Sequence, residues 1–304
     1  MTSLVDTALR LTYSGFGWRR VLRPRPIPGV RAYRLTGPAR LVVTIGTRDE
    51  LVDDCWGPCA EAERLRWLAG HGVPCPEIVD TGVMDGGQYL VARLPDGVPA
   101  VASWPRQQRL AVVDAVADLA RDLHALDAGD CPFDRSLKVT IPRAKQATVF
   151  AEVGGDAIAK LTTLIARALA TGKEEPAVCH GDLRPANVLI DPDTLRVTAV
   201  ADVARLGIAD RYTDLVAAGH GWPHAAQTRR YWYRYGEIPA DADRVNLYRL
   251  LAEFCLHRPR ARRVEPRQYA GDRRRRRLVR QRRGGVPRHP PVLDQGRCLV
   301  VQQT

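Results

Sequence analysis

The chain has 304 residues, of which 45% are hydrophobic and 26% are charged, so it can bury a core and is too apolar to be largely disordered. Its net charge of +12 lies entirely in residues 258–304, which hold 15 arginines and three acidic residues, whereas residues 1–257 hold 31 basic and 31 acidic residues. The longest stretch without a charged residue has 14 residues (215–228), too few to span a membrane.

Residues 1–93 are predicted to form a small lobe rich in strands. Short apolar runs at 32–36 and 41–45 predict two strands, and the Thr-Gly-Pro sequence between them predicts a hairpin turn. A helix is expected at 60–69, because its first turn is acidic and glycines follow it. Two further strands are expected at 78–81 and 88–93. The segment 94–99 interrupts every apolar period and is predicted to be a hinge.

Residues 100–257 are predicted to form a mainly helical lobe. Apolar residues recur at helical spacing after residue 107 and again over 158–169, and a last helix is expected at 241–254. Two short strands at 187–190 and 195–201 flank a turn between the helices. Residues 258–304 contain five consecutive arginines, several prolines and no apolar period, so we predict a disordered tail.

The most informative segment is the sequence HGDLRPAN at 180–187. His180, Asp182 and Asn187 have the spacing of a kinase catalytic loop, and Asp202 follows at the end of an apolar strand. In such a loop the aspartate accepts the proton of the attacking hydroxyl, and the asparagine and the later aspartate hold magnesium. A surface turn and a strand-end cap are the alternative interpretation. The kinase interpretation is favoured, because a carboxylate after five small or apolar residues is costly to bury unless it is paired.

The surrounding sequence resembles the aminoglycoside 3'-phosphotransferase family, which are kinase-like enzymes of antibiotic resistance. The stretch 179–215 resembles that family, as do EAERLRWL at 61–68, GVPCP at 72–76 and LHAL at 123–126. The resemblance extends over about residues 29–255. It implies an α+β, protein-kinase-like bilobal fold, with a small strand-rich N-terminal lobe and a mainly helical C-terminal lobe. It also implies transfer of the γ-phosphate of ATP to a hydroxyl, the 3'-hydroxyl, of an aminoglycoside.

The resemblance also assigns roles to the residues of the motif. Asp182 would be the catalytic base, and Asn187 and Asp202 would be the ligands of Mg²⁺. His180 and Arg205 would order the loop, with further support from Asp210 and Asp214. On the substrate side, Glu253 matches one acidic residue of the aminoglycoside pocket, and the nearest other acidic candidates are Glu152 and Asp156.

The nucleotide side departs from the family's pattern. Thr44 stands where the family has a phosphate-binding lysine, and Arg48 is a candidate substitute four residues later. Glu61 matches the helix glutamate that pairs with that lysine, and Gly29 is the one glycine kept in the preceding loop. These departures keep two interpretations open: an aminoglycoside phosphotransferase that is active or impaired, and a kinase-fold protein that binds nucleotide or drug without efficient turnover.

The partners and compartment follow from the same observations. An aminoglycoside is the expected small-molecule partner, and no membrane contact is expected. Nucleic-acid binding through the Arg-rich tail is a third hypothesis, against which a solvated extension is favoured. The N-terminus has no basic segment followed by an apolar one, so we expect no signal peptide. The seven scattered cysteines are typical of a reduced, cytoplasmic protein.

Overall fold

The computed structural model describes residues 4–21, 29–47, 57–84, 87–93, 95–142, 155–171, 174–236 and 241–256. Residues Met1–Arg260 form one compact unit. The tail predicted at 258–304 therefore lies outside the described residues. No described helix has the length and hydropathy to cross a membrane. The division into two lobes at 94–99 stays a prediction.

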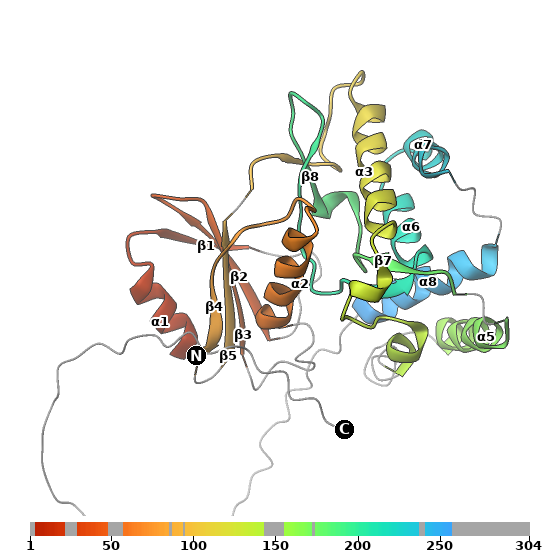
Figure 1. Ribbon diagram of the computed structural model, residues 1–304, viewed down its shortest axis with the longest axis horizontal. Coiled ribbons are helices and arrows are strands. Elements are labelled where there is room, and N and C mark those ends of the chain that lie inside the picture. The colour runs from red at the N-terminus through yellow and green to blue at the C-terminus, as the bar shows by residue number, and fades with distance from the viewer. Residues whose placement is uncertain are drawn as a thin grey trace, which may run out of the picture. The chain divides into compact units, whose positions relative to one another are not determined.

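The N-terminal part contains a five-stranded antiparallel sheet in the order β1-β2-β3-β5-β4 (Figure 1). Its strands are β1 (Gly17–Val21), β2 (Val30–Thr36), β3 (Leu41–Thr47), β4 (Ile78–Met84) and β5 (Gly87–Arg93). The four strands predicted in this region are confirmed as parts of β2 to β5. Leu35 pairs with Leu41, so the predicted hairpin is confirmed as well.

Helices cover both faces of this sheet because its strands alternate apolar side chains between the two faces. Val43 and Ile45 of β3 cluster with Leu9 of α1 (Leu4–Thr12). Thr44 points to the opposite face and pairs with Leu90, which clusters with residues of α2 (Pro58–Gly70). Thr44 is thereby buried on the face that α2 covers, at 5% exposure.

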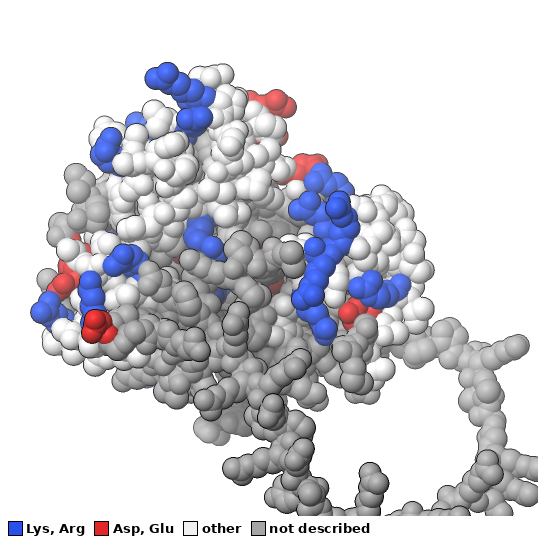
Figure 2. Space-filling model, turned by 180° about the vertical axis from the view of Figure 1, so that it is seen from behind, with Lys and Arg blue, Asp and Glu red and all other residues white. Residues whose placement is uncertain are grey.

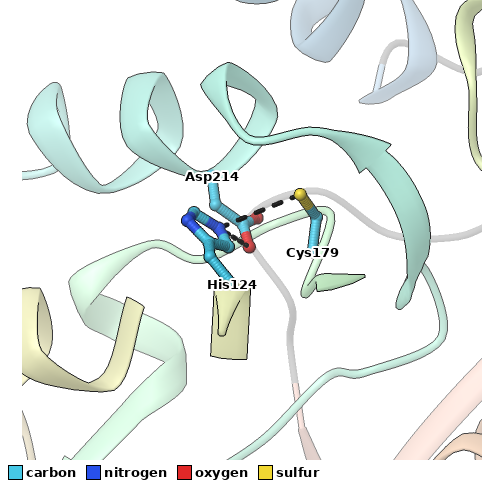
Figure 3. A group of neighbouring side chains, drawn as sticks. All are labelled: His124, Cys179 and Asp214. Carbon is cyan, nitrogen blue, oxygen red and sulfur yellow. Dashed lines mark hydrogen bonds and ion pairs between the residues drawn. The ribbon is translucent and has the colours of Figure 1, made fainter. Parts of the chain in front are cut away.

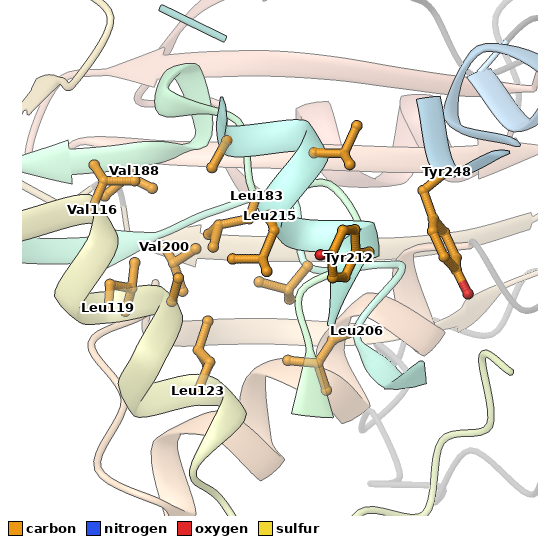
Figure 4. Close-up of a cluster of buried hydrophobic side chains, with 14 of the residues drawn as sticks. Val116, Leu119, Leu123, Leu183, Val188, Val200, Leu206, Tyr212, Leu215 and Tyr248 are labelled. Carbon is orange, nitrogen blue, oxygen red and sulfur yellow. The ribbon is translucent and has the colours of Figure 1, made fainter. Parts of the chain in front are cut away.

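The helical part is built around α3 (Arg109–His124), whose apolar side is buried along its whole length. Leu119 and Leu123 point toward Leu183 and Leu215, which belong to the loop after β7 and to α6 (Figure 4). Further helices are α5 (Gly155–Thr171), α6 (Tyr212–Gly219), α7 (Ala225–Tyr235) and α8 (Ala242–Leu256). The three helices predicted from periodicity are confirmed as α3, α5 and α8.

Two small sheets lie between these helices. The strands β6 (Val98–Pro99), β8 (Val188–Ile190) and β9 (Val197–Val200) form one antiparallel sheet, so the predicted hairpin is confirmed as β8 and β9. The strands β7 (Pro176–Cys179) and β10 (Gly207–Asp210) form the other. The candidate catalytic residues lie where these short strands end.

Direct contacts join α2 to the segment after β9. The Arg64 guanidinium donates from Nε to the main-chain oxygen of Leu206 (3.0 Å) and lies over the ring of Phe133. The amide of Val200 donates to the main-chain oxygen of Pro74 (2.8 Å). These bonds fix the segment that carries Asp202 against the region that follows α2.

Two ion pairs hold α7 along α3. Arg230 places Nε and Nη2 on the two carboxylate oxygens of Asp114, both at 2.6 Å. One turn further on, Arg234 does the same to Asp118, at 2.9 and 2.7 Å. Each pair uses the planar fork of arginine on both oxygens, which fixes orientation as well as distance.

Candidate active site

The loop predicted to be catalytic leaves the buried strand β7 at Cys179 and reaches β8 through a single turn, η3 (Pro185–Asn187). Its path depends on Gly181, whose φ is +81°. A Cβ at this position would lie 2.4 Å from the main-chain oxygen of Arg205. Only glycine therefore lets the loop pass this close to Arg205, and the two predicted segments are brought together at that point.

His180 fixes the loop through hydrogen bonds on both ring nitrogens. It is fully buried, and its Nδ1 accepts the amide of Asp182 (3.1 Å). Its Nε2 lies 3.1 Å from the main-chain oxygen of Ala201 and donates to it. The ring is therefore neutral and carries its proton on Nε2. It links the loop to the residue directly before Asp202.

Asp182, the predicted base, is 6% exposed and lies in a dense polar cluster. Arg184 donates to both of its carboxylate oxygens, from Nε and Nη2, at 2.7 Å each. Asn187 donates from Nδ2 to the main-chain oxygen of Asp182 (2.8 Å) and, at 3.4 Å, to Oδ2. The structure therefore brings the predicted base and one predicted metal ligand into contact, and it adds Arg184, which the sequence interpretation did not single out.

Asp202 completes this cluster from the end of β9. It is partly buried and has a φ of +63°, a conformation that aspartate adopts more readily than most residues. Burial lowers the pKa of Arg184, but the hydrogen bonds and charge of Asp182, together with the charge of Asp202, outweigh it, so that pKa is raised. Both carboxylates therefore act on the same guanidinium.

Asp214 holds the catalytic loop by hydrogen bonds to its main chain. It is fully buried at the start of α6 and accepts the amides of His180 (2.6 Å) and Gly181 (2.8 Å). Nε2 of His124 lies 3.4 Å from the same carboxylate, and Nδ1 of His124 lies 2.9 Å from the hydroxyl of Tyr235. Both oxygens of Asp214 are thus used by main-chain amides of the loop, which agrees with the supporting role predicted for it.

Cys179 joins His124 and Asp214 in a buried group with the composition of a metal site (Figure 3). Burial, with the charges of Asp214 and Asp210, raises the pKa of the Cys179 thiol well above its usual range. The thiol stays protonated and contacts the main-chain oxygens of Ala209 and Asp210. Asp214 already accepts two main-chain amides of the loop and His124 already contacts Tyr235, so we describe this group as a support of the loop.

A network of ion pairs joins the end of β10 to α8 beside the catalytic loop. Asp210 is 2% exposed at the end of β10, and Arg244 of α8 donates to it from Nε (3.0 Å) and Nη2 (2.7 Å). Arg244 also donates to Glu175 and lies over the ring of Tyr212. Burial lowers the pKa of Arg244, but the bonds to Asp210 and Glu175 outweigh it and raise the pKa. The hydrogen bond from Arg244 is the main reason that the pKa of Glu175 is lowered.

A pocket lies between this network and the catalytic loop. It encloses about 510 Å³, including the part that is open to solvent. The residues around it include Gly181, Arg205, Asp210, Glu174, Tyr248 and Leu251. It thus touches the loop, the end of β10 and α8, with acidic residues from two of its sides.

The remaining predicted residues lie in several elements. Gly29 has a φ of +73° directly before β2, and Glu61 lies in the first turn of α2, on the side of the sheet to which Thr44 points. Asp156 is exposed in the first turn of α5. Glu253 belongs to α8, but its side chain lies outside what the structure describes, as do Arg48 and Glu152 entirely.

The surface charge matches the balance of residues 1–257. On the face drawn in Figure 2, the basic side chains of the described residues lie in separate groups, several of them beside acidic ones. The described part of this face thus gives no support to a nucleic-acid site, and the hypothesis that placed one on the tail falls outside the described residues.

Comparison with known proteins identifies relatives over most of the chain. Residues 25–248 match the model of the phosphotransferase enzyme family. An aminoglycoside 3'-phosphotransferase from Streptomyces fradiae is 37% identical over 268 residues, which are 82% of this chain and 99% of that protein. A streptomycin 3''-kinase from Streptomyces griseus is 34% identical over 64% of this chain and 79% of its own length.

Solved structures give the same result. A crystal structure of an aminoglycoside 3'-phosphotransferase of type VIII is 38% identical, with a TM-score of 0.66 over 82% of this chain and 97% of that one. The phosphotransferase APH(3'')-Id from Streptomyces rimosus, in complex with ADP and streptomycin, is 26% identical, with a TM-score of 0.68 over 84% and 99% of the two chains. These matches confirm the predicted kinase-like α+β fold.

Proposed function

This chain belongs to the phosphotransferase enzyme family, and from that membership we propose that it is an aminoglycoside phosphotransferase. It transfers the γ-phosphate of ATP to a hydroxyl group of an aminoglycoside antibiotic and so confers resistance. The 3'-hydroxyl is the acceptor we favour, because relatives at 37% and 38% identity are named 3'-phosphotransferases. The observation that carries the proposal is the cluster of Asp182, Asn187, Arg184 and Asp202 around one loop.

Asp182 is the general base of the reaction. Its carboxylate accepts the proton of the acceptor hydroxyl as the oxygen of that hydroxyl forms a bond to the γ-phosphorus. The bond between that phosphorus and the bridging oxygen breaks, and ADP leaves. His180, which is hydrogen-bonded to the amide of Asp182, and Arg205, which touches Gly181, hold the loop in place for this step.

Asn187 and Asp202 fit the role of magnesium ligands. Both offer oxygen donors, which Mg²⁺ prefers, and both act on the same arginine-centred cluster as the base. When bound, Mg²⁺ neutralises charge on the phosphates. The amide nitrogen of Asn187 already bonds to Asp182, so the amide oxygen is the donor that remains for a metal.

The nucleotide is expected beside β3 and α2. Gly29 lies at the turn before β2, and its positive φ suits a close approach of the main chain to a phosphate. Thr44 and Glu61 lie on one side of the sheet, where the family pairs a lysine with a glutamate. We propose that Glu61 keeps its position although Thr44 stands in the place of the family's lysine, and that Arg48 is the candidate replacement for that lysine.

The aminoglycoside is expected in the pocket between the catalytic loop and α8. Aminoglycosides are polycations, and Glu174 and Asp210 contribute carboxylates to the walls of this pocket. Asp210 is already neutralised by Arg244, so Glu174 is the stronger candidate of the two. Glu253, Asp156 and Glu152 stay proposals for the outer part of the site.

A kinase-fold protein without efficient turnover is the second candidate function. The presence of Thr44 favours this second candidate, because a buried threonine cannot supply the positive charge that a phosphate-binding lysine would bring. The second candidate binds nucleotide or drug, and it differs from the first in lacking efficient transfer of the phosphate.

The test is a coupled assay of ADP release with a panel of aminoglycosides, followed by NMR of the product to identify the phosphorylated hydroxyl. Drug-dependent ADP release that is lost in Asp182→Asn would support the enzyme. Nucleotide binding without drug-dependent release would support the second candidate. The role of Asn187 and Asp202 as Mg²⁺ ligands is tested by measuring how the activity of Asn187→Ala and Asp202→Ala depends on Mg²⁺ concentration. An unchanged Mg²⁺ dependence would refute that role.

The compartment is a proposal of the same kind. The four cysteines that the structure describes in full, Cys59, Cys75, Cys131 and Cys179, are all free thiols. Free thiols and a need for ATP agree with work in the cytoplasm.

A further inference from the structure

Arg64 of α2 is a buried cation that contacts the segment following Asp202. Its Nε donates to the main-chain oxygen of Leu206 (3.0 Å), and its Nη1 donates to the main-chain oxygen of Ala60, one turn earlier on the helix (2.9 Å). The guanidinium carbon lies 4.4 Å from the centre of the Phe133 ring, and the residue is 7% exposed. A charge buried to this degree is stable only where such contacts replace water, so the position of Arg64 is tightly fixed.

The contact at Leu206 fixes the end of a short turn that begins after Asp202. The amide of Leu206 donates to the main-chain oxygen three residues earlier (2.9 Å), which closes the turn. Arg205 in the same turn lies directly against Gly181 of the catalytic loop. Asp202 itself has a φ of +63°, a conformation that is retained only where the surrounding structure holds it. Arg64 contributes to that hold, because its donor fixes the turn four residues after Asp202.

Arg64 itself belongs to the helix that covers the face to which Thr44 points. Glu61 lies three residues before Arg64 on α2, so the two residues are neighbours on one side of the helix. The apolar side of α2 packs in the same cluster as Leu90, which pairs with Thr44 of β3. A displacement of α2 against the sheet would therefore move Arg64, and with it the turn after Asp202.

We propose that Arg64 is a positioning residue, which fixes Asp202 relative to α2 and thereby aligns the magnesium-binding carboxylate with the nucleotide. Arg64 does not act by contact with substrate or metal but through the main-chain oxygen of Leu206. The inference rests on the proposed function, because it requires a magnesium–nucleotide complex at Asp202. It predicts that loss of the guanidinium weakens the use of Mg²⁺ and slows phosphate transfer, whereas binding of the aminoglycoside is unchanged.

The experiment measures nucleotide binding as well as turnover. Calorimetric titrations with AMP-PNP, a non-hydrolysable analogue of ATP, give the Mg²⁺ requirement, which is the Mg²⁺ concentration at half of the maximal AMP-PNP affinity. In Arg64→Gln this requirement should rise about tenfold, because residues that orient a metal ligand affect metal affinity by about 10–100-fold. The kcat should fall about 10–100-fold with an unchanged KM for kanamycin. Arg64→Lys keeps the charge over the ring but lacks the planar fork, so its values should lie between those of Arg64→Gln and the wild type.

A second contact of α2 provides the matched control. Trp67 lies three residues after Arg64 and donates from Nε1 to the main-chain oxygen of Asp130 (3.0 Å). It thus joins α2 to another part of the chain by the same kind of bond, but its acceptor does not belong to the turn after Asp202. Trp67→Phe should therefore lower the melting temperature and leave the Mg²⁺ requirement and kcat unchanged.

Phe133→Leu keeps the test open should Arg64→Gln not fold. Leucine retains most of the apolar volume but removes the ring beneath the guanidinium, so it weakens the hold on Arg64 without abolishing the hydrogen bond. The Mg²⁺ requirement should then rise by about two- to fivefold. In Arg64→Gln/Phe133→Leu the two effects should not add, because the ring acts through the guanidinium. Circular dichroism checks that each variant is folded.

The outcomes separate this inference from the function on which it rests. A folded Arg64→Gln variant with the Mg²⁺ requirement of the wild type would overturn the role of Arg64 alone. An equal rise of the Mg²⁺ requirement in Trp67→Phe would also overturn it, because any loosening of α2 would then have the same effect. A wild type with neither AMP-PNP binding nor turnover would overturn the proposed function and this inference together.

Discussion

At the scale of single residues, the catalytic loop has no room for a side chain at Gly181. We predict that Gly181→Ala unfolds the protein at lower temperature and loses most of its activity, because the new methyl group meets the main-chain oxygen of Arg205 at 2.4 Å. Gly72→Ala is the matched control, since Gly72 has a similar φ of +72° but open space around it. The control should cost about 1 kcal/mol, the strain of the left-handed conformation alone. Equal losses in the two variants would contradict the steric argument.

The variant Thr44→Lys tests whether the lysine missing from β3 limits nucleotide binding. We predict that it raises kcat/KM for ATP, because the new ammonium would lie on the face covered by α2, where Glu61 can pair with it. The gain should be absent in Thr44→Lys/Glu61→Ala. Thermal melting is the control, since Thr44 is 5% exposed and a buried lysine without a partner would destabilise the fold. A folded variant with unchanged kinetics would show that another group already binds the phosphates.

Residue spacing predicted the loop but not its contacts. The pattern of His180, Asp182 and Asn187 indicated a kinase loop, because chemistry constrains those types at that spacing. Arg184 gave no such signal, since the sequence does not show that its side chain folds back onto Asp182. Arg244 was missed for a related reason: 34 residues separate it from Asp210, and only the packing of α8 brings the two together.

At the scale of elements, the attachment of α8 depends on Arg244. We predict that Arg244→Met lowers the free energy of unfolding by about 3 kcal/mol or more, because it leaves Asp210 buried without its cationic partner and with the amide of Tyr212 as a donor. Side-chain exposure is 12% for Arg244 and 1% for Asp210. Chemical denaturation measures the change, and Asp210→Asn/Arg244→Met should recover part of it.

A second ion pair of α8 is the matched control for that prediction. Arg167 of α5 binds Asp243, and these side chains are 63% and 53% exposed. Arg167→Met should therefore change the free energy of unfolding by about 1 kcal/mol or less. Comparable losses in both variants would mean that burial does not decide the strength of these pairs.

Periodicity located the elements that bury one regular face and missed the others. It indicated α3, α5 and α8 and four of the five strands of the N-terminal sheet, β2 to β5, but not β1. It missed β7 and β10, which have four residues each and are too short for an alternating pattern. It also missed α7, whose sequence AAQTRRYWYRY is polar because two of its arginines bind α3 by ion pairs.

At the scale of the whole molecule, residues 1–257 have no net charge, whereas residues 258–304 carry the entire net charge of +12. The described elements end with α8 at Leu256, and the first compact unit ends at Arg260. We predict that a chain of residues 1–260 melts at the same temperature as the full chain and binds kanamycin more tightly at low salt. It lacks 13 arginines and three acidic residues, whose net charge repels a polycation.

Salt provides the control for that prediction. At physiological ionic strength, charges are screened over about 8 Å, so the difference in affinity between the two chains should shrink as salt is added. Calorimetric titration of both chains at low and moderate salt measures it. A lower melting temperature or weaker drug binding in the shorter chain would show that residues 261–304 contribute to the folded structure.

The two ion pairs between α3 and α7 also fix how the two helices are aligned along their length. Asp114 with Arg230 and Asp118 with Arg234 advance by four residues on both helices, so the helices run in the same direction, about 6 Å per pair. His124 and Tyr235, the last residues of the two helices, meet through their side chains, with Nδ1 of His124 2.9 Å from the hydroxyl of Tyr235. One residue inserted between Arg234 and Tyr235 would turn the tyrosine by about 100° away from the histidine. The position of Tyr235 at the end of α7 therefore matters for His124, whose Nε2 lies 3.4 Å from the carboxylate of Asp214.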